Sequence, residues 1–113
     1  MFDPREYYAF ASKLYAYEDS QECYRTTVSR AYYAAFLVAR DKRNLSSVGE
    51  GGHLRVVDNL RNSTDIADIK TGNRLDSLRT LRTKADYKCQ ESLVKREAGE
   101  SLALSQKILE HLG

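Results

Sequence analysis

Arg82, Asp86 and Tyr87 are the group of residues in this sequence most able to do chemistry. If they lie on a helix, Arg82 and Asp86 share one face, one turn apart. The simplest interpretation is a structural ion pair worth about 0.3 kcal/mol. The alternative is that Arg82, together with Arg79, holds a phosphate group, a role that suits the planar fork of donors on arginine. Tyr87 either covers the core with its ring or takes part in proton transfer.

The chain has two histidines, whose ordinary pKa is the one closest to neutrality among side chains. His53 follows Gly51 and Gly52 at an expected helix start, where a histidine is usually a surface or capping residue. It would approach Arg82 if the preceding loop folded back. His111 lies in an expected last helical turn, where a cation complements the helix dipole, and we assign it no function.

Positive charge gathers in one segment. The chain has a net charge of only +2, but Lys70 to Lys88 carries six lysines and arginines against two aspartates, a net charge of +4. A solvated helix face and an RNA-binding surface are both open interpretations. In the second interpretation, the RNA contacts would come from Arg74, Arg79, Arg82 and Lys84.

The first half of the chain predicts two helices. Asp3-Pro4-Arg5-Glu6 is typical of a helix start, and apolar residues follow at helical spacing to about Tyr17. A second start at Asp19-Ser20-Gln21-Glu22 predicts a helix that runs to about Arg43.

The middle of this second helix, Ala31 to Ala39, is apolar almost all round, which indicates burial on every side. It is either the central helix of a bundle or half of a dimer interface. If the chain dimerises, Tyr33, Phe36 and Leu37 should lie at or near the interface. Arg30 adjoins this apolar stretch and needs an acidic partner, for which Asp86 is a candidate.

Glycine, serine and asparagine clusters divide the second half. Thr64 or Asp65 can cap the fourth helix, and the run Thr71-Gly72-Asn73 predicts an interruption or kink within it. The expected elements are a mobile loop over Asn44–Gly52, a short helix around Leu54–Leu60, a fourth helix over Ile66–Tyr87, a linker over Lys88–Leu93 and a last helix from about Lys95 to Leu112.

Composition narrows the class of protein. A length of 113 residues indicates a single domain over residues 1–113, and 42% hydrophobic with 30% charged residues is typical of a globular chain. One proline and few glycines favour long helices, so we expect an all-α bundle of four to five helices. Cys23 and Cys89 stand apart, so we expect idle thiols and neither a metal nor a cofactor. Neither a signal peptide nor a membrane-spanning run is evident, which predicts a soluble cytoplasmic protein.

Two phrases carry a family resemblance. Ser29-Arg30-Ala31-Tyr32-Tyr33-Ala34-Ala35-Phe36 lies on the second expected helix, and Leu81-Arg82-Thr83-Lys84-Ala85-Asp86-Tyr87 ends the fourth. Between them, the run around His53 lies on the short helix. In this order they resemble the HEPN superfamily of prokaryotic defence and toxin–antitoxin proteins, over roughly Tyr7 to Leu112.

The resemblance implies a helical bundle that usually dimerises. Many HEPN proteins are metal-independent endoribonucleases, whose signature is an arginine followed after four to six residues by a histidine, and whose dimer brings two copies over one RNA strand. Other members lack this signature and act as RNA-binding scaffolds or as partners of small nucleotidyltransferases.

This chain departs from the nuclease signature, because no arginine precedes either histidine at that interval. Asp86 and Tyr87 stand where the histidine is expected, and Asp86 beside Arg82 should stay ionised, which makes it a poor base. If the chain cleaves RNA, the candidate catalytic residues are Arg82, Asp86, Tyr87 and His53, acting without a metal.

We therefore expect a homodimeric, HEPN-like component of a prokaryotic toxin–antitoxin or defence module that binds RNA, with RNA cleavage left as an open alternative. The alternative is a non-catalytic interaction subunit that docks a small nucleotidyltransferase or another partner protein. A helical dimerisation module without a nucleic-acid role is the third hypothesis. The basic segment favours RNA contact, whereas the missing histidine motif favours the interaction subunit.

Overall fold

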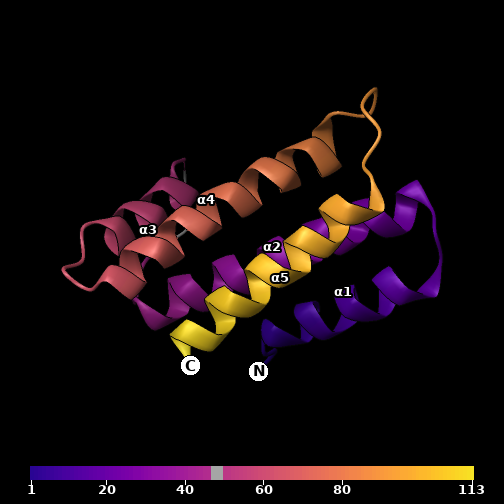
Figure 1. Cartoon of the computed structure of the whole chain (residues 1–113). Helices are drawn as coiled ribbons and strands as arrows, with labels where there is room; N and C mark the ends of the chain where they lie inside the picture. The colour runs from indigo at the N-terminus through magenta and orange to yellow at the C-terminus, as the bar shows by residue number, and fades with distance from the viewer. Residues whose placement is uncertain (47–49) are drawn as a thin grey trace.

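The computed structural model describes residues 1–46 and 50–113, and these residues form five α-helices and no strand (Figure 1). The all-α prediction is confirmed, and each expected helix is present close to its expected bounds. Part of the predicted loop over Asn44–Gly52, residues 47–49, lies outside the described residues. The helices are α1 (Arg5–Tyr17), α2 (Gln21–Lys42), α3 (Gly52–Arg61), α4 (Ile66–Tyr87) and α5 (Lys95–Leu112).

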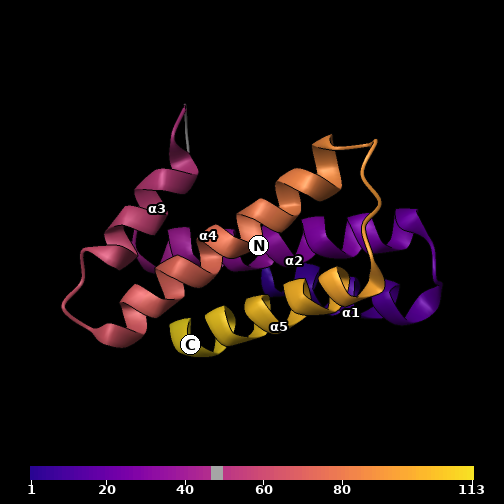
Figure 2. The same ribbon diagram turned by 45° about the horizontal axis from the view of Figure 1, so that its top comes forward.

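The α2 helix is the centre of the bundle and packs against all four other helices. Figures 1 and 2 show α1 and α5 running along α2, while α4 crosses it and carries α3 at one end. The two chain ends lie close together, where Arg5 Nη2 donates to the carbonyl oxygen of Gly113 at 2.6 Å. Of the two interpretations of the apolar helix, the structure supports the central helix of a bundle.

Side-chain caps begin the helices where the sequence predicts. Ser20 Oγ accepts from the amide of Cys23 at 3.2 Å at the start of α2. At the start of α4, Asp65, and not Thr64, accepts from the amide of Ala67 at 2.9 Å. These bonds satisfy backbone donors that a helix leaves unpaired in its first turn.

The predicted interruption of the fourth helix is wrong, because α4 is continuous through Thr71-Gly72-Asn73. Gly72 is buried where α3 crosses α4. A Cβ atom there would lie 3.1 Å from Leu60 Cβ and 3.2 Å from the carbonyl oxygen of Val57. The glycine therefore serves the close approach of two helices and does not break one.

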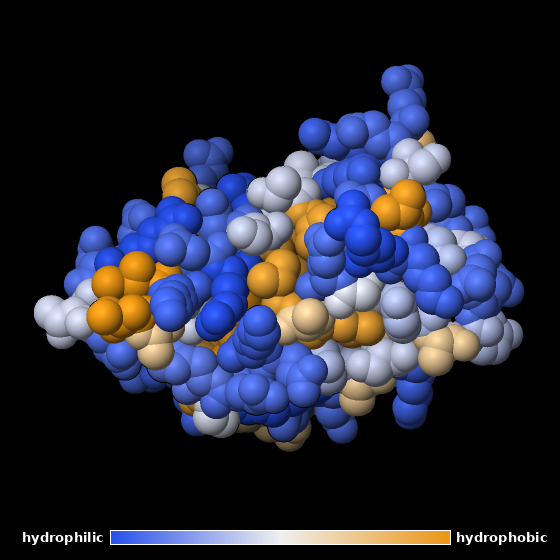
Figure 3. All heavy atoms as spheres, viewed as in Figure 1, coloured by the Kyte–Doolittle hydropathy of each residue, from blue (hydrophilic) through white to orange (hydrophobic). Residues whose placement is uncertain are grey.

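Most of the apolar stretch of α2 is buried within this single chain. Tyr32 and Phe36 pack with leucines and valines of α3 and α4 and with Ile108 of α5. The first helix is less covered than its periodicity indicates: Ala11 is buried, but Phe10 and Tyr17 are 50% and 78% exposed. On the face drawn in Figure 3, hydrophobic atoms form separate spots in a hydrophilic surface. No helix among the described residues combines the length and apolarity needed to cross a membrane.

Candidate functional site

Arg82 lies at the centre of the cluster that the sequence singles out. Its Nε donates to Asp86 Oδ2 at 2.9 Å, so the predicted ion pair one helical turn apart is confirmed. Its Nη2 donates to the hydroxyl of Tyr33 on α2 at 2.7 Å and approaches the hydroxyl of Tyr87 at 3.4 Å. Arg82 therefore joins the two phrases that carry the family resemblance.

Three tyrosine rings surround this guanidinium group. The Arg82 Cζ atom lies 5.5 Å from the ring centroid of Tyr32, 5.2 Å from that of Tyr33 and 5.3 Å from that of Tyr87. Such cation–π contacts hold a cation without neutralising its charge. Within the described residues, Nη1 has no hydrogen-bond acceptor, yet no unpaired side-chain atom is shut away from solvent. Nη1 is therefore not fully buried and retains N–H groups that could donate to an anion.

Arg30 does not pair directly with Asp86, as the sequence suggested. Its Cζ lies 5.0 Å from the ring centroids of both Tyr7 and Tyr33. Its Nη2 donates to Ser29 Oγ at 3.1 Å, and Ser29 in turn donates to Asp86 Oδ2 at 3.3 Å. The rings of Tyr7 and Tyr33 therefore stabilise the charge of Arg30, a role that was expected of a carboxylate. The hydroxyl of Ser29 links Arg30 to Asp86.

His53 is not a surface or capping residue, because it is only 8% exposed. Its Nδ1 lies 2.8 Å from the hydroxyl of Tyr32, and its Nε2 lies 3.2 Å from Asp76 Oδ1. Burial lowers the pKa of His53, although the hydrogen bond to Asp76 opposes this. The neutral ring then accepts from Tyr32 and donates to Asp76. Burial also raises the pKa of the Tyr32 hydroxyl to about 12.

His53 and Arg82 are linked only through Tyr32 among the described residues. His53 forms a hydrogen bond with the Tyr32 hydroxyl, and Arg82 lies over the Tyr32 ring. An imidazole that is buried, uncharged and bonded at both nitrogens is poorly placed to move a proton to or from a substrate. The structure brings Arg82, Asp86 and Tyr87 together and leaves His53 behind Tyr32.

The residues predicted to bind RNA have different surroundings. Arg79 is exposed and Arg74 is half-buried, and neither forms an ion pair with any described residue. Lys84 is engaged, since its Nζ lies 2.9 Å and 3.1 Å from the two carboxylate oxygens of Glu97 on α5. Of the predicted RNA-binding residues near Arg82, Arg79 is therefore the one whose charge is not paired with a described carboxylate. It lies one turn earlier on α4.

The predicted dimer interface is partly inside the chain. Phe36 is 8% exposed and belongs to the core, whereas Tyr33 and Leu37 are half-buried. The apolar girdle of α2 that motivated the dimer is largely covered by the chain's own helices. Dimerisation stays a prediction, with Leu37 as the residue best placed to test it.

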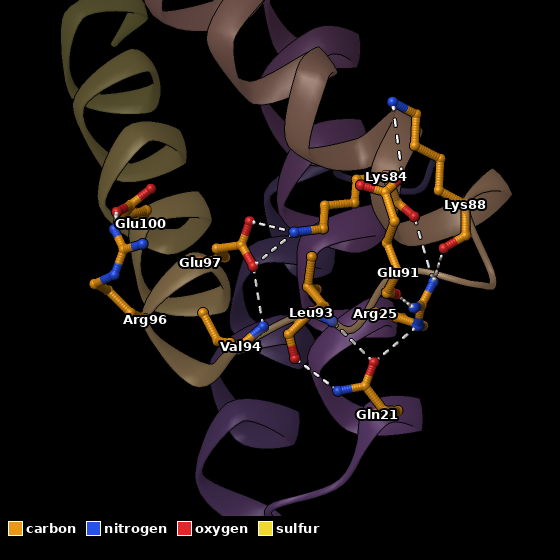
Figure 4. Close-up of polar contacts among 10 residues, drawn as sticks. All are labelled: Gln21, Arg25, Lys84, Lys88, Glu91, Leu93, Val94, Arg96, Glu97 and Glu100. Carbon is orange, nitrogen blue, oxygen red and sulfur yellow. Dashed lines mark hydrogen bonds and ion pairs between the residues drawn. The ribbon is translucent and has the colours of Figure 1, made fainter.

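A clamp that the sequence did not predict holds the end of α4: the side chain of Arg25, which binds four backbone carbonyl groups (Figure 4). Arg25 of α2 donates to the carbonyl oxygens of Ala85 at 3.0 Å, Lys84 at 3.3 Å and Lys88 at 3.4 Å, and also to that of Glu91. The carbonyl oxygens of Lys84 and Lys88 also accept backbone amides, from Lys88 and Glu91, whereas that of Ala85 receives its bond from Arg25. A cation at this end of α4 also complements the helix dipole. The only signal in the sequence is an arginine in the predicted second helix, ahead of the apolar stretch Ala31–Ala39.

Asp68 is a second structural centre. Its carboxylate accepts from Arg43 at 2.7 Å, Ser63 at 2.6 Å and His111 at 2.6 Å, and the bond from Arg43 contributes most to lowering its pKa far below the ordinary value. With Asp65 and His111 it forms the group of described residues that could hold a metal ion. The three hydrogen bonds already explain the arrangement as a tie between α2, α4 and α5.

Within the described residues, the site offers cations and an open aromatic ring, which suits the binding of an anion next to a flat ligand. No protein-family model, curated protein or solved structure matches the chain in the comparisons made. The functional interpretation accordingly depends on the residues and their geometry.

Proposed function

We propose that this chain is a HEPN-like, RNA-binding component of a prokaryotic toxin–antitoxin or defence module, and that it binds RNA without cleaving it. The observation that carries the proposal is Arg82, which pairs with Asp86 through Nε and lies among three tyrosine rings. Its Nη1 has no hydrogen-bond partner among the described residues, and Arg79, one turn away, forms no ion pair with them. The planar fork of donors on a preorganised guanidinium group is well suited to binding two oxygens of a phosphate.

The surroundings of the candidate catalytic groups support binding over cleavage. Asp86 Oδ2 already accepts hydrogen bonds from both Arg82 and Ser29, so it is engaged within the chain. His53 is buried and neutral. Metal-independent cleavage of RNA needs a base for the 2′-hydroxyl and an acid for the leaving oxygen. Among the described residues, no accessible imidazole lies beside Arg82 to meet either requirement, because the other histidine, His111, is bonded to Asp68 in the first turn of α4.

Binding is tested by fluorescence anisotropy with a labelled single-stranded RNA. The affinity should fall steeply with salt, because bound cations release counterions from the phosphates. Arg79→Ala should weaken binding and reduce the salt slope by about one counterion. Lys107→Ala is the matched control, since Lys107 is an exposed cation on α5, away from this cluster. Equal losses in both variants would indicate nonspecific attraction to charge.

Cleavage is tested separately by incubating the RNA with the chain in EDTA. We expect the RNA to remain intact. Cleavage by wild type that disappears in both Arg82→Ala and His53→Ala would contradict the non-cleaving assignment and restore the catalytic hypothesis.

The exposed side chains of Phe10 and Tyr17 on α1 favour the second candidate function, an interaction subunit that docks a nucleotidyltransferase. Exposed aromatic residues are enriched where proteins meet. The absence of RNA binding at low salt, together with a complex that Phe10→Ser abolishes, would move the assignment to this function.

A further inference from the structure

The connection between α4 and α5 borders an open hollow on the surface next to the Arg82 cluster. Its volume is about 430 Å³, and its lining runs along the chain from Tyr87 through Lys88, Cys89 and Gln90 to Glu91. This volume lies within the range of sites that hold small flat ligands. Because Tyr87 also contacts Arg82, the hollow begins at the ring that borders the anion-binding group.

Tyr87 is 67% exposed. An exposed ring beside a cation is the usual platform on which an unpaired nucleobase stacks. The side-chain amide of Gln90 makes no hydrogen bond within the described residues and carries both donors and an acceptor. This amide can therefore form hydrogen bonds with the polar edge of a nucleobase.

The wall of the hollow is held in place from α2. Arg25 binds the carbonyl oxygens of Lys88 and Glu91, which lie on the wall, as well as those of the last turn of α4. Gln21 pairs with both backbone polar groups of Leu93, at 2.6 Å and 3.0 Å. Figure 4 shows both side chains reaching from α2 to this connection. A loop fixed in this way does not lose further freedom when a ligand binds.

We propose that this hollow is a seat for one unpaired nucleobase, which stacks on Tyr87 while the adjoining phosphate binds Arg82 and Arg79. Arg25 is a positioning residue for this seat and does not touch the base. The inference rests on the proposed RNA binding and adds to it a base-dependent contact at a defined place.

Cys89 gives a direct test in the unmodified chain. It is exposed and lies on the wall of the hollow, whereas Cys23 is buried, so iodoacetamide should alkylate Cys89 selectively. Saturating oligoadenylate RNA should slow this alkylation several-fold. A base-free ribose-phosphate oligomer of equal length and charge should slow it much less. If saturating oligoadenylate leaves the alkylation rate unchanged, the seat is wrong and RNA binding itself still stands. If neither oligomer binds, both proposals fall.

Variants test the seat through the ratio of affinities for oligoadenylate and the base-free oligomer. Tyr87→Leu should lower this ratio about tenfold, because stacking on one aromatic ring contributes that much per base. Tyr87→Phe should retain the ratio, since it keeps the ring and loses only the hydroxyl. Arg79→Ala should weaken both oligomers together. A ratio that Tyr87→Leu leaves unaltered would overturn the proposal.

Arg25→Ala should lower the same ratio although Arg25 lies outside the base contact, and combining it with Tyr87→Leu should add little further loss. Fully additive losses would show that Arg25 does not act through the seat. If Arg25→Ala does not fold, Gln90→Ala replaces it, because Gln90 is exposed and should also lower the ratio.

Discussion

Tyr32→Phe removes a single oxygen atom from the buried interior of this protein. The Tyr32 hydroxyl donates to His53 Nδ1 at 2.8 Å, and the ring stacks on Phe36 with its centroid at 5.7 Å and an interplanar angle of 11°. Phenylalanine keeps the ring, its stacking and its volume. The substitution therefore isolates the hydrogen bond.

The magnitude follows from burial. Tyr32 is 4% exposed and His53 is 8% exposed, so water has little access to the nitrogen that loses its donor. A buried acceptor left without a partner costs about 1–3 kcal/mol. For a chain of 113 residues, an unfolding entropy of about 2 cal/mol/K per residue converts this loss to a decrease in Tm of roughly 4–13 °C.

Thermal unfolding of Tyr32→Phe, followed by circular dichroism, measures this decrease. Tyr17→Phe is the matched control, because Tyr17 is 78% exposed and should lose no stability on removal of its hydroxyl. The dependence of stability on pH under alkaline conditions gives a second measurement. The pKa of Tyr32 is raised from 10.0 to about 12, so wild type should lose stability between those values and Tyr32→Phe should lose less. Equal Tm values for both variants and wild type would refute a contribution from the Tyr32–His53 bond.

Three further predictions concern the packing, the pH response and the assembly. Gly72→Ala should destabilise the chain in a urea titration despite a helix-propensity gain of about 1 kcal/mol, because the new Cβ would meet a backbone carbonyl at 3.2 Å. Gly99→Ala is the control and should be neutral or stabilising, because the nearest atom is a movable tyrosine hydroxyl at 3.1 Å. Since burial lowers the folded pKa of His53, the unfolded chain binds more protons below the ordinary value of 6.5, and the free energy of unfolding should fall as pH drops from 6.5 through the folded pKa. An unchanged acid slope in His53→Gln would contradict this assignment. Light scattering should show a dimer that Leu37→Asp converts to monomer, and a wild-type monomer at every concentration would remove the dimer hypothesis.

Local patterns predicted the helices and one feature of the site. The capping residues Ser20 and Asp65 lie next to the backbone amides that they bind, so their sequence positions alone indicate where α2 and α4 begin. The Arg82–Asp86 pair is likewise local, because helix geometry brings residues four apart onto one face. These features depend on neighbours along the chain and needed no knowledge of the fold.

Local patterns also misled where packing overrides propensity. Gly72 looks like a break, but the approach of α3 requires a residue without a side chain. Phe10 and Tyr17 have the spacing of a buried face, yet α1 lies at the edge of the bundle and has few neighbours to cover them.

The remaining chemistry of the site comes from residues far apart in the chain. Tyr32 and His53 are 21 positions apart, and Arg25 and Glu91 are 66 apart. Which of these side chains meet depends on the angle and rotation at which whole helices pack, and several packings are compatible with the same apolar stripes. Amino-acid types and their spacing thus specify five helices and the Arg82–Asp86 pair. The burial of His53, the three tyrosine rings around Arg82 and the binding of Arg25 to the end of α4 arise only because helix packing brings distant side chains together.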